Sequence, residues 1–406
     1  MEASLQQDEQ FPANKNTKCI LPWIHQYGDL SGQYGLCCFS IYQNEKNSFG
    51  KGTRPSEAFN HPFMKSTRLA MLNNEEVSAC KICYDWEKNG IESHRQRMNI
   101  RFSQYSFLYG NTSSDGHINS PPIYIDFRFG NICNFKCRMC GSFASSAWSK
   151  EAKFHGMMHE TEPNHFDYWT NNDSFWKDID QIKKYIRVIY FAGGEPFVQE
   201  GHYKLLEFLA NNDCTNIEIS YNTNLSYDGK FKKYKIEDLW DKFTKVELWP
   251  SVDGFKLKAE YGRKGLEWSL FEANVLRFLP YISTFSIVGN IYSISSNCEL
   301  VKWIKSLNKT FNITNLVHPE FLSTSILDKQ TKKLIIASYN EFLKSNYKLF
   351  NENEINSILD SLKHMRYNDD SHLSQKFKQY NVKLDLYRNE SFENTYPELA
   401  EWYKNI

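Results

Sequence analysis

Residues 123–140 read IYIDFRFGNICNFKCRMC. Apolar residues alternate with Tyr124 and Asp126 over the first five positions, which is the two-residue period of a β-strand. Gly130 then favours a loop. The sequence therefore predicts a strand followed by a loop that carries three cysteines at C-x3-C-x2-C spacing: Cys133, Cys137 and Cys140.

Three thiolates on one short loop can bind one face of a cubic iron–sulfur cluster. A four-iron cluster then keeps one iron without a protein ligand, and a chelating cofactor can bind there. The alternatives are a zinc knuckle or three buried thiols. Structural zinc takes four ligands, usually in paired C-x2-C units, so the x3 spacing and the missing fourth ligand argue against zinc.

This loop resembles the hallmark of the radical S-adenosylmethionine (SAM) superfamily, C-x3-C-x2-C after the first strand of a partial barrel. Met139 stands where that hallmark often has an aromatic residue. The resemblance implies a [4Fe-4S] cluster held by the three cysteines, with SAM bound at its open iron.

A second motif follows the predicted strand 187–191: Gly193-Gly194-Glu195-Pro196. The two glycines allow the backbone to approach a ligand closely. The segment resembles the GGE motif of the same superfamily, which holds the amino group of SAM. By that resemblance Glu195 accepts a charge-assisted hydrogen bond from the amine. The alternative is an ordinary turn.

Four further residues are candidates for SAM binding. Asn222 follows the strand 216–221, where a polar residue lies on the reactive rim of a barrel or caps a turn. Ser251 and Asp253 resemble the S-[IV]-D-G segment of SPASM-type enzymes, and their spacing puts both on one side of a strand. Arg263 resembles the arginine that pairs with the SAM carboxylate, although a surface arginine is the alternative.

The amino-terminal region carries a second group of cysteines, Cys19, Cys37, Cys80 and Cys83. A hairpin centred on Gly32 would bring Cys19 and Cys37 together, and the other two would complete four ligands. The spacing C-x12-G-x4-C resembles the opening of SPASM and twitch domains. That resemblance implies an auxiliary [4Fe-4S] cluster, here before the barrel rather than after it.

Two alternatives remain open for this region. A structural zinc site could use the same four cysteines, because the two ligand sets are alike. Cys38 could replace Cys37 as a ligand, although the glycine spacing favours Cys37.

The remaining periodicity predicts alternating strands and helices. Strands are expected at 123–127, 187–191, 216–221, 246–249, 286–292 and 313–317, and helices at 138–155, 203–209, 236–243, 300–307, 333–350 and 354–365. We therefore expect an α/β fold, namely the partial (β/α)6 TIM-like barrel of the superfamily.

Three domains follow from this pattern. Residues 1–115 form a twitch-like auxiliary domain, 116–324 the barrel, and 325–406 a helical cap on the open side of the barrel. A partner-binding module is the alternative for the last. Asp385 and Arg388 are three apart and could pair on a helix surface.

Composition narrows the class of protein. Ten cysteines in 406 residues, clustered by spacing, indicate metal binding in a reducing cytoplasm. Residues 1–10 do not resemble a signal peptide, and no apolar run approaches the roughly 20 residues of a membrane span. The balance of 48 basic and 48 acidic residues does not indicate a nucleic-acid partner.

The resemblance implies an enzyme that cleaves SAM to a 5′-deoxyadenosyl radical, which abstracts hydrogen from an unidentified substrate. The auxiliary cluster would assist oxidation or cross-linking of a peptide or protein side chain, or of a small metabolite. The electron donor would be of flavodoxin or ferredoxin type. The alternative is a non-enzymatic iron–sulfur or zinc-binding interaction protein.

Overall fold

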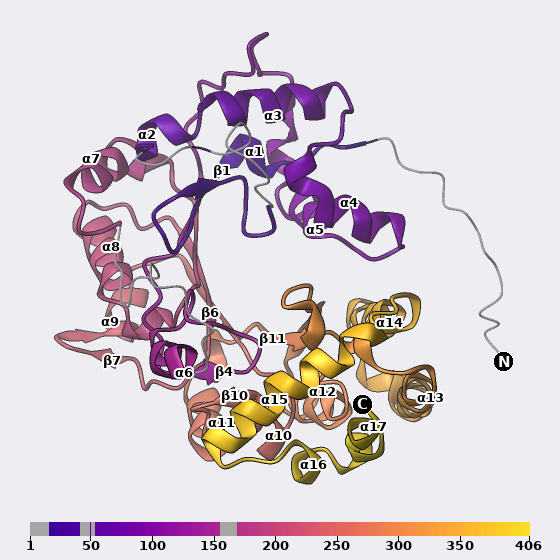
Figure 1. The fold of residues 1–406 in the computed structure, drawn as a ribbon. Helices are drawn as coiled ribbons and strands as arrows, with labels where there is room; N and C mark the ends of the chain where they lie inside the picture. The colour runs from indigo at the N-terminus through magenta and orange to yellow at the C-terminus, as the bar shows by residue number, and fades with distance from the viewer. Residues whose placement is uncertain (1–15, 41–48, 50–52, 155–168) are drawn as a thin grey trace. The chain divides into compact units, whose positions relative to one another are not determined.

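The computed structural model describes residues 16–40, 49, 53–154 and 169–406 (Figure 1). The chain divides into two compact units. The first comprises residues 1–29, 33–125 and 177–185, and the second comprises 30–32, 126–176 and 186–406. Among the described residues, no helix is both long and apolar enough to span a membrane.

The first unit is mainly helical. Its helices are α1 (Leu21–Ile24), α2 (Pro55–Ala58), α3 (Pro62–Leu72), α4 (Lys81–Lys88) and α5 (His94–Arg101), with 3-10 turns η2 (Ser78–Cys80) and η3 (Ser103–Tyr109). The Ser93 hydroxyl accepts from the Gln96 amide while the Gln96 side chain accepts from the Ser93 amide, which fixes the start of α5.

The predicted amino-terminal hairpin is present. Strands β1 (His25–Gly28) and β2 (Tyr34–Gly35) are antiparallel, with Tyr27 opposite Gly35. The Asp29 amide donates to the Gln33 carbonyl at 2.8 Å, which closes the turn. The hairpin reverses the chain between Cys19 and Cys37, as the sequence predicts.

The second unit contains a sheet in which parallel pairs predominate. All six predicted strands are present: β3 (Tyr124–Phe127), of which only Asp126 and Phe127 belong to this unit, β5 (Val188–Phe191), β6 (Glu218–Thr223), β9 (Lys245–Pro250), β11 (Thr284–Gly289) and β12 (Thr310–Asn315). β5, β6 and β9 pair in parallel, and so do β11 and β12. Two parallel bridges, Leu248 with Ile282 and Ser251 with Ser286, connect β9 to the β11 segment. β11 and β12 begin two and three residues before the predicted positions.

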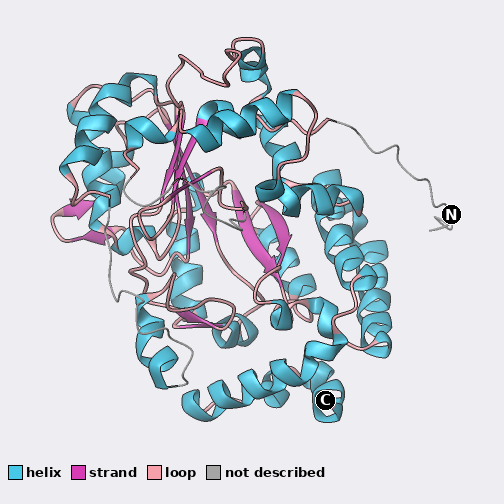
Figure 2. Ribbon diagram, turned by 45° about the horizontal axis from the view of Figure 1, so that its top comes forward, coloured by secondary structure: helices cyan, strands magenta, loops and turns pink. Residues whose placement is uncertain are grey.

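Helices alternate with these strands along the chain (Figure 2). They are α6 (Ser149–Phe154), α7 (Asp173–Ile182), α8 (Glu200–Asn211), α9 (Ile236–Trp240), α10 (Leu257–Gly262), α11 (Trp268–Arg277) and α12 (Asn297–Ser306). Short strands β7 (Lys230–Phe231) and β8 (Tyr234–Lys235) form a hairpin, and β4 (Lys136–Cys137) pairs with β10 (Arg263–Lys264). The α/β class is confirmed, and the closure of the sheet into a partial barrel stays a prediction.

The predicted helix at 138–155 is wrong over most of its length. Helix α6 begins only at Ser149, and the residues before it form β4, turns and a 3-10 segment, while His155 lies outside the described residues. The Ser145 hydroxyl donates to the Phe135 carbonyl at 2.5 Å. Serine side chains that bond distant backbone groups favour turns over helix, and here they fold the loop back on itself.

The carboxyl-terminal segment is helical and belongs to the second unit. It contains α13 (Lys329–Asn346), α14 (Glu352–Tyr367), α15 (Ser374–Arg388), α16 (Phe392–Thr395) and α17 (Ala400–Asn405). The Ser357 hydroxyl of α14 accepts from the Ile313 amide of β12 at 2.7 Å, so α14 lies directly against the sheet. Both helices predicted here, 333–350 and 354–365, are present, and the role of the segment as a cap stays a prediction.

Candidate functional site

The candidate site lies where the parallel strands end. Phe191, Tyr221 and Leu248 are aligned across β5, β6 and β9, so the residues after them emerge at the same edge of the sheet. The carboxyl edge of a parallel sheet is where α/β proteins place their ligands. Gly193-Gly194-Glu195 follows β5 at this edge, and Asp253 follows β9.

The cysteine loop is attached to the GGE loop by backbone contacts. The Glu195 amide donates to the Ile132 carbonyl at 2.9 Å. Gln199 donates its side-chain amide to the carbonyls of Gly193 at 2.7 Å and Gly130 at 3.1 Å. A Cβ on Gly194, which has a φ of +55°, would stand 2.4 Å from the Ile132 oxygen. A side chain at this position would collide with the cysteine loop, so the glycine allows the two loops to pack.

The three cysteines of this loop are free thiols that influence one another. Burial, and next the Cys137 thiol, raise the pKa of Cys133. The same two causes raise the pKa of Cys140 to about 12. The Phe135 amide, at 3.5 Å, and the Asn224 side-chain amide, at 3.9 Å, donate to the Cys133 sulfur. Such donors stabilise a metal-bound thiolate, so the loop's chemistry fits an iron–sulfur cluster.

Glu195 is buried at the centre of this edge, with 1% of its surface exposed. Its carboxylate accepts from the Thr223 hydroxyl at 2.7 Å, the Asn224 amide at 2.6 Å and the Phe197 amide at 3.1 Å. Burial raises the pKa of Glu195 to about 7 despite these bonds. Among the described residues no cation forms a contact ion pair with it, and Arg263, which acts without such a contact, lowers its pKa less than the hydrogen bonds do.

Asp253 and Arg263 form a buried ion pair with each other. The Arg263 Nε and Nη2 atoms lie 2.8 and 2.7 Å from one Asp253 oxygen. The other oxygen accepts from the Val288 amide at 2.6 Å. Burial raises the pKa of Cys137, and Arg263 counteracts that rise. Arg263 is therefore not a surface residue, and its guanidinium lies between a carboxylate and the cysteine loop.

The strands have two chemically different faces. On the face with Ile189, Ile219 and Leu248 the side chains are apolar and buried. The opposite face is more polar: beside the aromatic rings of Tyr190 and Trp249 it carries Asn222, whose Nδ2 lies 3.4 Å from the Ser286 hydroxyl of β11. Asn222 therefore contacts β11, on the far side of β9, instead of capping a turn, and its Oδ1 is buried without a partner among the described residues.

Ser251 lies at the end of β9, where it bridges to Ser286 of the β11 segment. Sequence reasoning missed two residues beside it at the same edge, Thr223 and Asn224. Both hydrogen-bond to Glu195, and Asn224 also donates to the Cys133 sulfur. The run Asn222-Thr223-Asn224 was the available signal, but the sequence does not say which of the three faces the cysteine loop.

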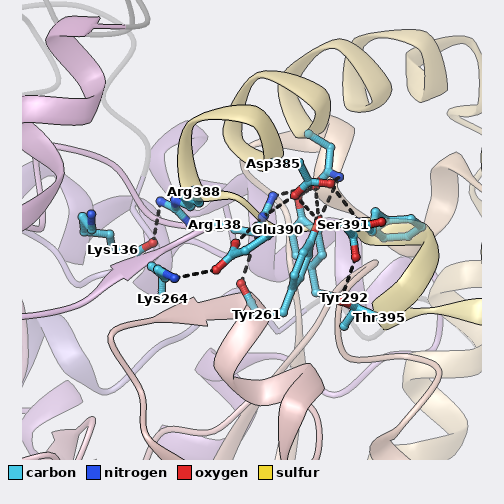
Figure 3. Close-up of polar contacts among 12 residues, drawn as sticks. Lys136, Arg138, Tyr261, Lys264, Tyr292, Asp385, Arg388, Glu390, Ser391 and Thr395 are labelled. Carbon is cyan, nitrogen blue, oxygen red and sulfur yellow. Dashed lines mark hydrogen bonds and ion pairs between the residues drawn. The ribbon is translucent and has the colours of Figure 1, made fainter.

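Arg138 attaches the cysteine loop to helix α15 (Figure 3). Its side chain has 0% exposure, and its Nη2 atom lies 2.6 Å from both Asp385 Oδ1 and Glu390 Oε2. The guanidinium also stands 3.7 Å from the centroid of the Tyr261 ring, and the Tyr261 hydroxyl donates to Asp385 at 2.7 Å. Residue 138 lies inside the C-x3-C-x2-C motif, so α15 fixes the position of the motif.

A second buried ion pair also connects helix α15 to the region of the cysteine loop. Arg388 of α15 pairs with Glu151 of α6 at 2.7 Å, and both side chains are 1% exposed. Arg388 also donates to the Lys136 carbonyl at 2.9 Å (Figure 3). The predicted surface pair of Asp385 with Arg388 is therefore wrong. Each of the two instead pairs with a residue more than 200 positions away.

The four amino-terminal cysteines approach one another within the first unit. Burial and then the Cys83 thiol are among the causes that raise the pKa of Cys19 to about 12. The pKa of Cys37 is raised by burial first, then by the adjacent Cys38, and also by Cys80, Cys83 and Cys19. Cys80 ends η2 and Cys83 lies in the first turn of α4, three residues later, so the two share one side of the helix start.

The neighbours of this group distinguish Cys37 from Cys38. Cys38 is exposed, whereas Cys37 is partly buried and interacts with the other three cysteines. Arg95 counteracts the rise in the pKa of Cys19 and Cys80 and forms an ion pair with Glu87.

Across the described residues, no three His, Cys, Asp or Glu side chains converge closely enough to hold one metal ion. A cubic cluster places each thiolate on a different iron, so its cysteines stand farther apart than the ligands of a single ion. The assignment of both cysteine groups as metal ligands therefore stays a prediction.

Comparisons with known proteins do not assign the chain to a family. No protein-family model and no curated protein matches the chain. Among solved structures, a crystal structure of Streptococcus suis SuiB bound to S-adenosylmethionine matches with a TM-score of 0.38 and 14% identity. The match covers 75% of this chain and 65% of SuiB, and a likeness at this TM-score carries no argument about function.

Proposed function

We propose that this protein is a radical SAM enzyme. The observation that supports it most is the meeting of the cysteine loop with Glu195 at the carboxyl edge of the parallel strands. Hydrogen bonds from Asn224 to the Cys133 sulfur and to Glu195 link the two. A buried carboxylate without a contact ion pair among the described residues, beside three thiols, suits a ligand that has an amine and binds at a metal cluster.

Different residues of the chain would bind the cluster and SAM. Cys133, Cys137 and Cys140 hold a [4Fe-4S] cluster, which when bound supplies the electron that cleaves SAM to methionine and a 5′-deoxyadenosyl radical. Glu195 accepts hydrogen bonds from the SAM amine, and Gly193-Gly194 keep the backbone close to the cysteine loop.

The remaining candidates surround this position. Arg263 would neutralise the SAM carboxylate, and its ion pair with Asp253 would hold the Arg263 guanidinium in place. Asn222 and Ser251 would contact the ribose or adenine from the polar face of the strands. The strand order suits the partial (β/α)6 barrel of the superfamily, which would exclude water from the radical.

Cys19, Cys37, Cys80 and Cys83 would hold an auxiliary [4Fe-4S] cluster in a twitch-like domain. An auxiliary cluster suits a net oxidation or cross-link of a peptide or protein side chain, or of a small metabolite. A flavodoxin- or ferredoxin-type protein would donate the electron. Because free thiols persist in a reducing compartment, we place the protein in the cytoplasm.

The test is anaerobic purification followed by metal analysis and incubation with SAM and dithionite. We expect iron far in excess of zinc and 5′-deoxyadenosine as a product. Zinc at both cysteine groups, with no cleavage of SAM, would instead identify a non-enzymatic zinc-binding protein.

A further inference from the structure

A pocket of about 430 Å³ opens beside the cysteine loop, between that loop and helix α15. Cys140 forms part of its wall, and the aromatic side chains of Trp148, Phe321 and Tyr380 form much of the rest. Tyr380 also donates its hydroxyl to the Arg138 carbonyl at 2.7 Å. The proposed cluster ligand Cys140 is therefore adjacent to an apolar concavity.

Large apolar side chains continue this surface. Phe143, from the turn after Cys140, is 65% exposed, and Phe154 of α6 is 71% exposed. The Phe154 ring lies 4.9 Å from the ring of Tyr387, which is 44% exposed. Phe377 of the same helix α15 is buried in the core. Exposed apolar residues next to a concavity are typical of an interaction site.

The charge of this surface is positive. Lys376 and Lys383 both line the pocket from α15 and are exposed, and neither forms an ion pair with a described residue. The Lys376 ammonium stands 4.9 Å from the centroid of the Phe321 ring. The carboxylates of Asp385 and Glu390 are paired with buried Arg138 instead. No carboxylate of a described residue therefore neutralises either lysine at the rim.

We propose that this surface, formed by Phe143, Phe154, Lys376, Lys383 and Tyr387, docks an acidic electron-transfer protein. The proposal rests on the proposed function, because that function needs an electron from outside. An apolar centre with a basic rim complements a donor that is acidic around an exposed cofactor. Cys140 in the pocket wall offers such a donor a short path to the cluster site.

The proposed step at this surface is the transfer of one electron. The reduced donor, a flavin hydroquinone or a reduced iron–sulfur protein, loses one electron, which is taken up at the site of Cys133, Cys137 and Cys140. No bond is made or broken, and no proton is required at this surface. The chain's part is to hold the donor close and in one orientation.

The experiment reverses both charges with Lys376→Glu/Lys383→Glu in the full-length, cluster-loaded protein. The probe is a purified acidic flavodoxin, reduced in advance. Stopped-flow spectroscopy measures the rate at which it reduces each protein, and calorimetry measures its binding. We expect both the rate and the affinity to fall by about tenfold or more at low salt, because steering between opposite charges is lost. The difference should shrink at about 0.5 M salt, where charges are screened.

Two controls accompany the double variant. Dithionite is small and needs no docking surface, so at about 0.5 M salt, where the steering of this anion is screened, it should reduce variant and wild type at equal rates. Lys344→Glu/Lys348→Glu makes the same charge change at exposed positions outside the pocket, where neither lysine has an ion pair with a described residue. We expect flavodoxin to bind and reduce this control as it does wild type.

Each other outcome overturns the proposal. Equal binding and equal reduction of all three proteins by flavodoxin would mean that the donor docks elsewhere. Light scattering that shows a wild-type dimer, separated by the Lys376→Glu/Lys383→Glu change, would assign the surface to a second copy of this chain. If dithionite-reduced wild type makes no 5′-deoxyadenosine, the proposed function fails first and the docking surface with it.

Discussion

Glu195 is a buried carboxylate with three hydrogen-bond donors and no ion pair among the described residues. The amine of SAM would supply the missing charge, and a charge-assisted bond contributes about 1.5–3 kcal/mol. We therefore expect Glu195→Gln to weaken SAM binding by roughly ten- to a hundredfold. The measurement is a titration of SAM into reconstituted wild type and variant. An unchanged affinity would remove Glu195 from the site.

The pH dependence of the free energy of unfolding tests whether the pKa of Glu195 is raised in the folded protein. Burial raises the Glu195 pKa from 4.5 to about 7, so between these values the folded protein binds more protons than the unfolded protein. The contribution of Glu195 to the free energy of unfolding therefore falls as pH rises through this window. Glu195→Gln cannot titrate, so in urea unfolding of the metal-free protein its stability should decline less over this range. Equal slopes would show that the Glu195 carboxylate ionises at its ordinary pKa.

At the scale of elements, Arg138 is the contact between the cysteine loop and α15. Arg138→Met would leave Asp385 and Glu390 without their shared cation in a buried place. Removing one partner of a buried ion pair costs about 3–5 kcal/mol. We expect a loss of that size in the free energy of unfolding of the metal-free protein, measured with urea.

Lys264→Met is the matched control for this element. Lys264 also pairs with Glu390, at 2.7 Å, but its side chain is 38% exposed. Partly exposed pairs contribute about 0–1 kcal/mol, so the control should change stability little. Losses of equal size in Arg138→Met and Lys264→Met would contradict the view that α15 holds the loop through Arg138.

The sequence predicted these elements unevenly, and the reason is physical. Short apolar or alternating runs bounded by turn residues identified all six strands, because these signals lie within each strand's own sequence. The helix expected at 138–155 failed because the Ser145 hydroxyl bonds back to the Phe135 carbonyl within the same loop, and because Arg138 bonds to Asp385 far along the chain. The same reason defeated the expected pairing of Asp385 with Arg388. Local spacing contains no information about such long-range partners.

At the scale of the whole molecule, the sequence predicted which residues lie at the candidate site but not which residues they contact. It selected Cys133, Glu195 and Asp253, which all lie at the carboxyl edge of the strands. It did not predict that Asp253 pairs with Arg263, or that Asn224 lies between Glu195 and Cys133. A sequence motif specifies residue types at a fixed spacing. The burial of those side chains and their ion pairs and hydrogen bonds depend on how the strands are aligned.

The first unit yields its own prediction. Replacing Cys19, Cys37, Cys80 and Cys83 with alanine should lower the iron content by about half, because each four-iron site carries the same load. Cys37→Ala alone should also reduce iron, and Cys38→Ala should not, since Cys38 is exposed while Cys37 interacts with the other three. Full retention of iron with loss of zinc would identify a zinc site instead.

The most direct test of the central claim replaces Cys133, Cys137 and Cys140 with alanine and measures 5′-deoxyadenosine after incubation with SAM and dithionite. The variant should keep the iron of the auxiliary site, which shows that the protein is still folded and loaded. We predict that it makes no 5′-deoxyadenosine while wild type does. Production of 5′-deoxyadenosine by the triple variant at the wild-type level would contradict the assignment of this loop as the site of radical SAM chemistry.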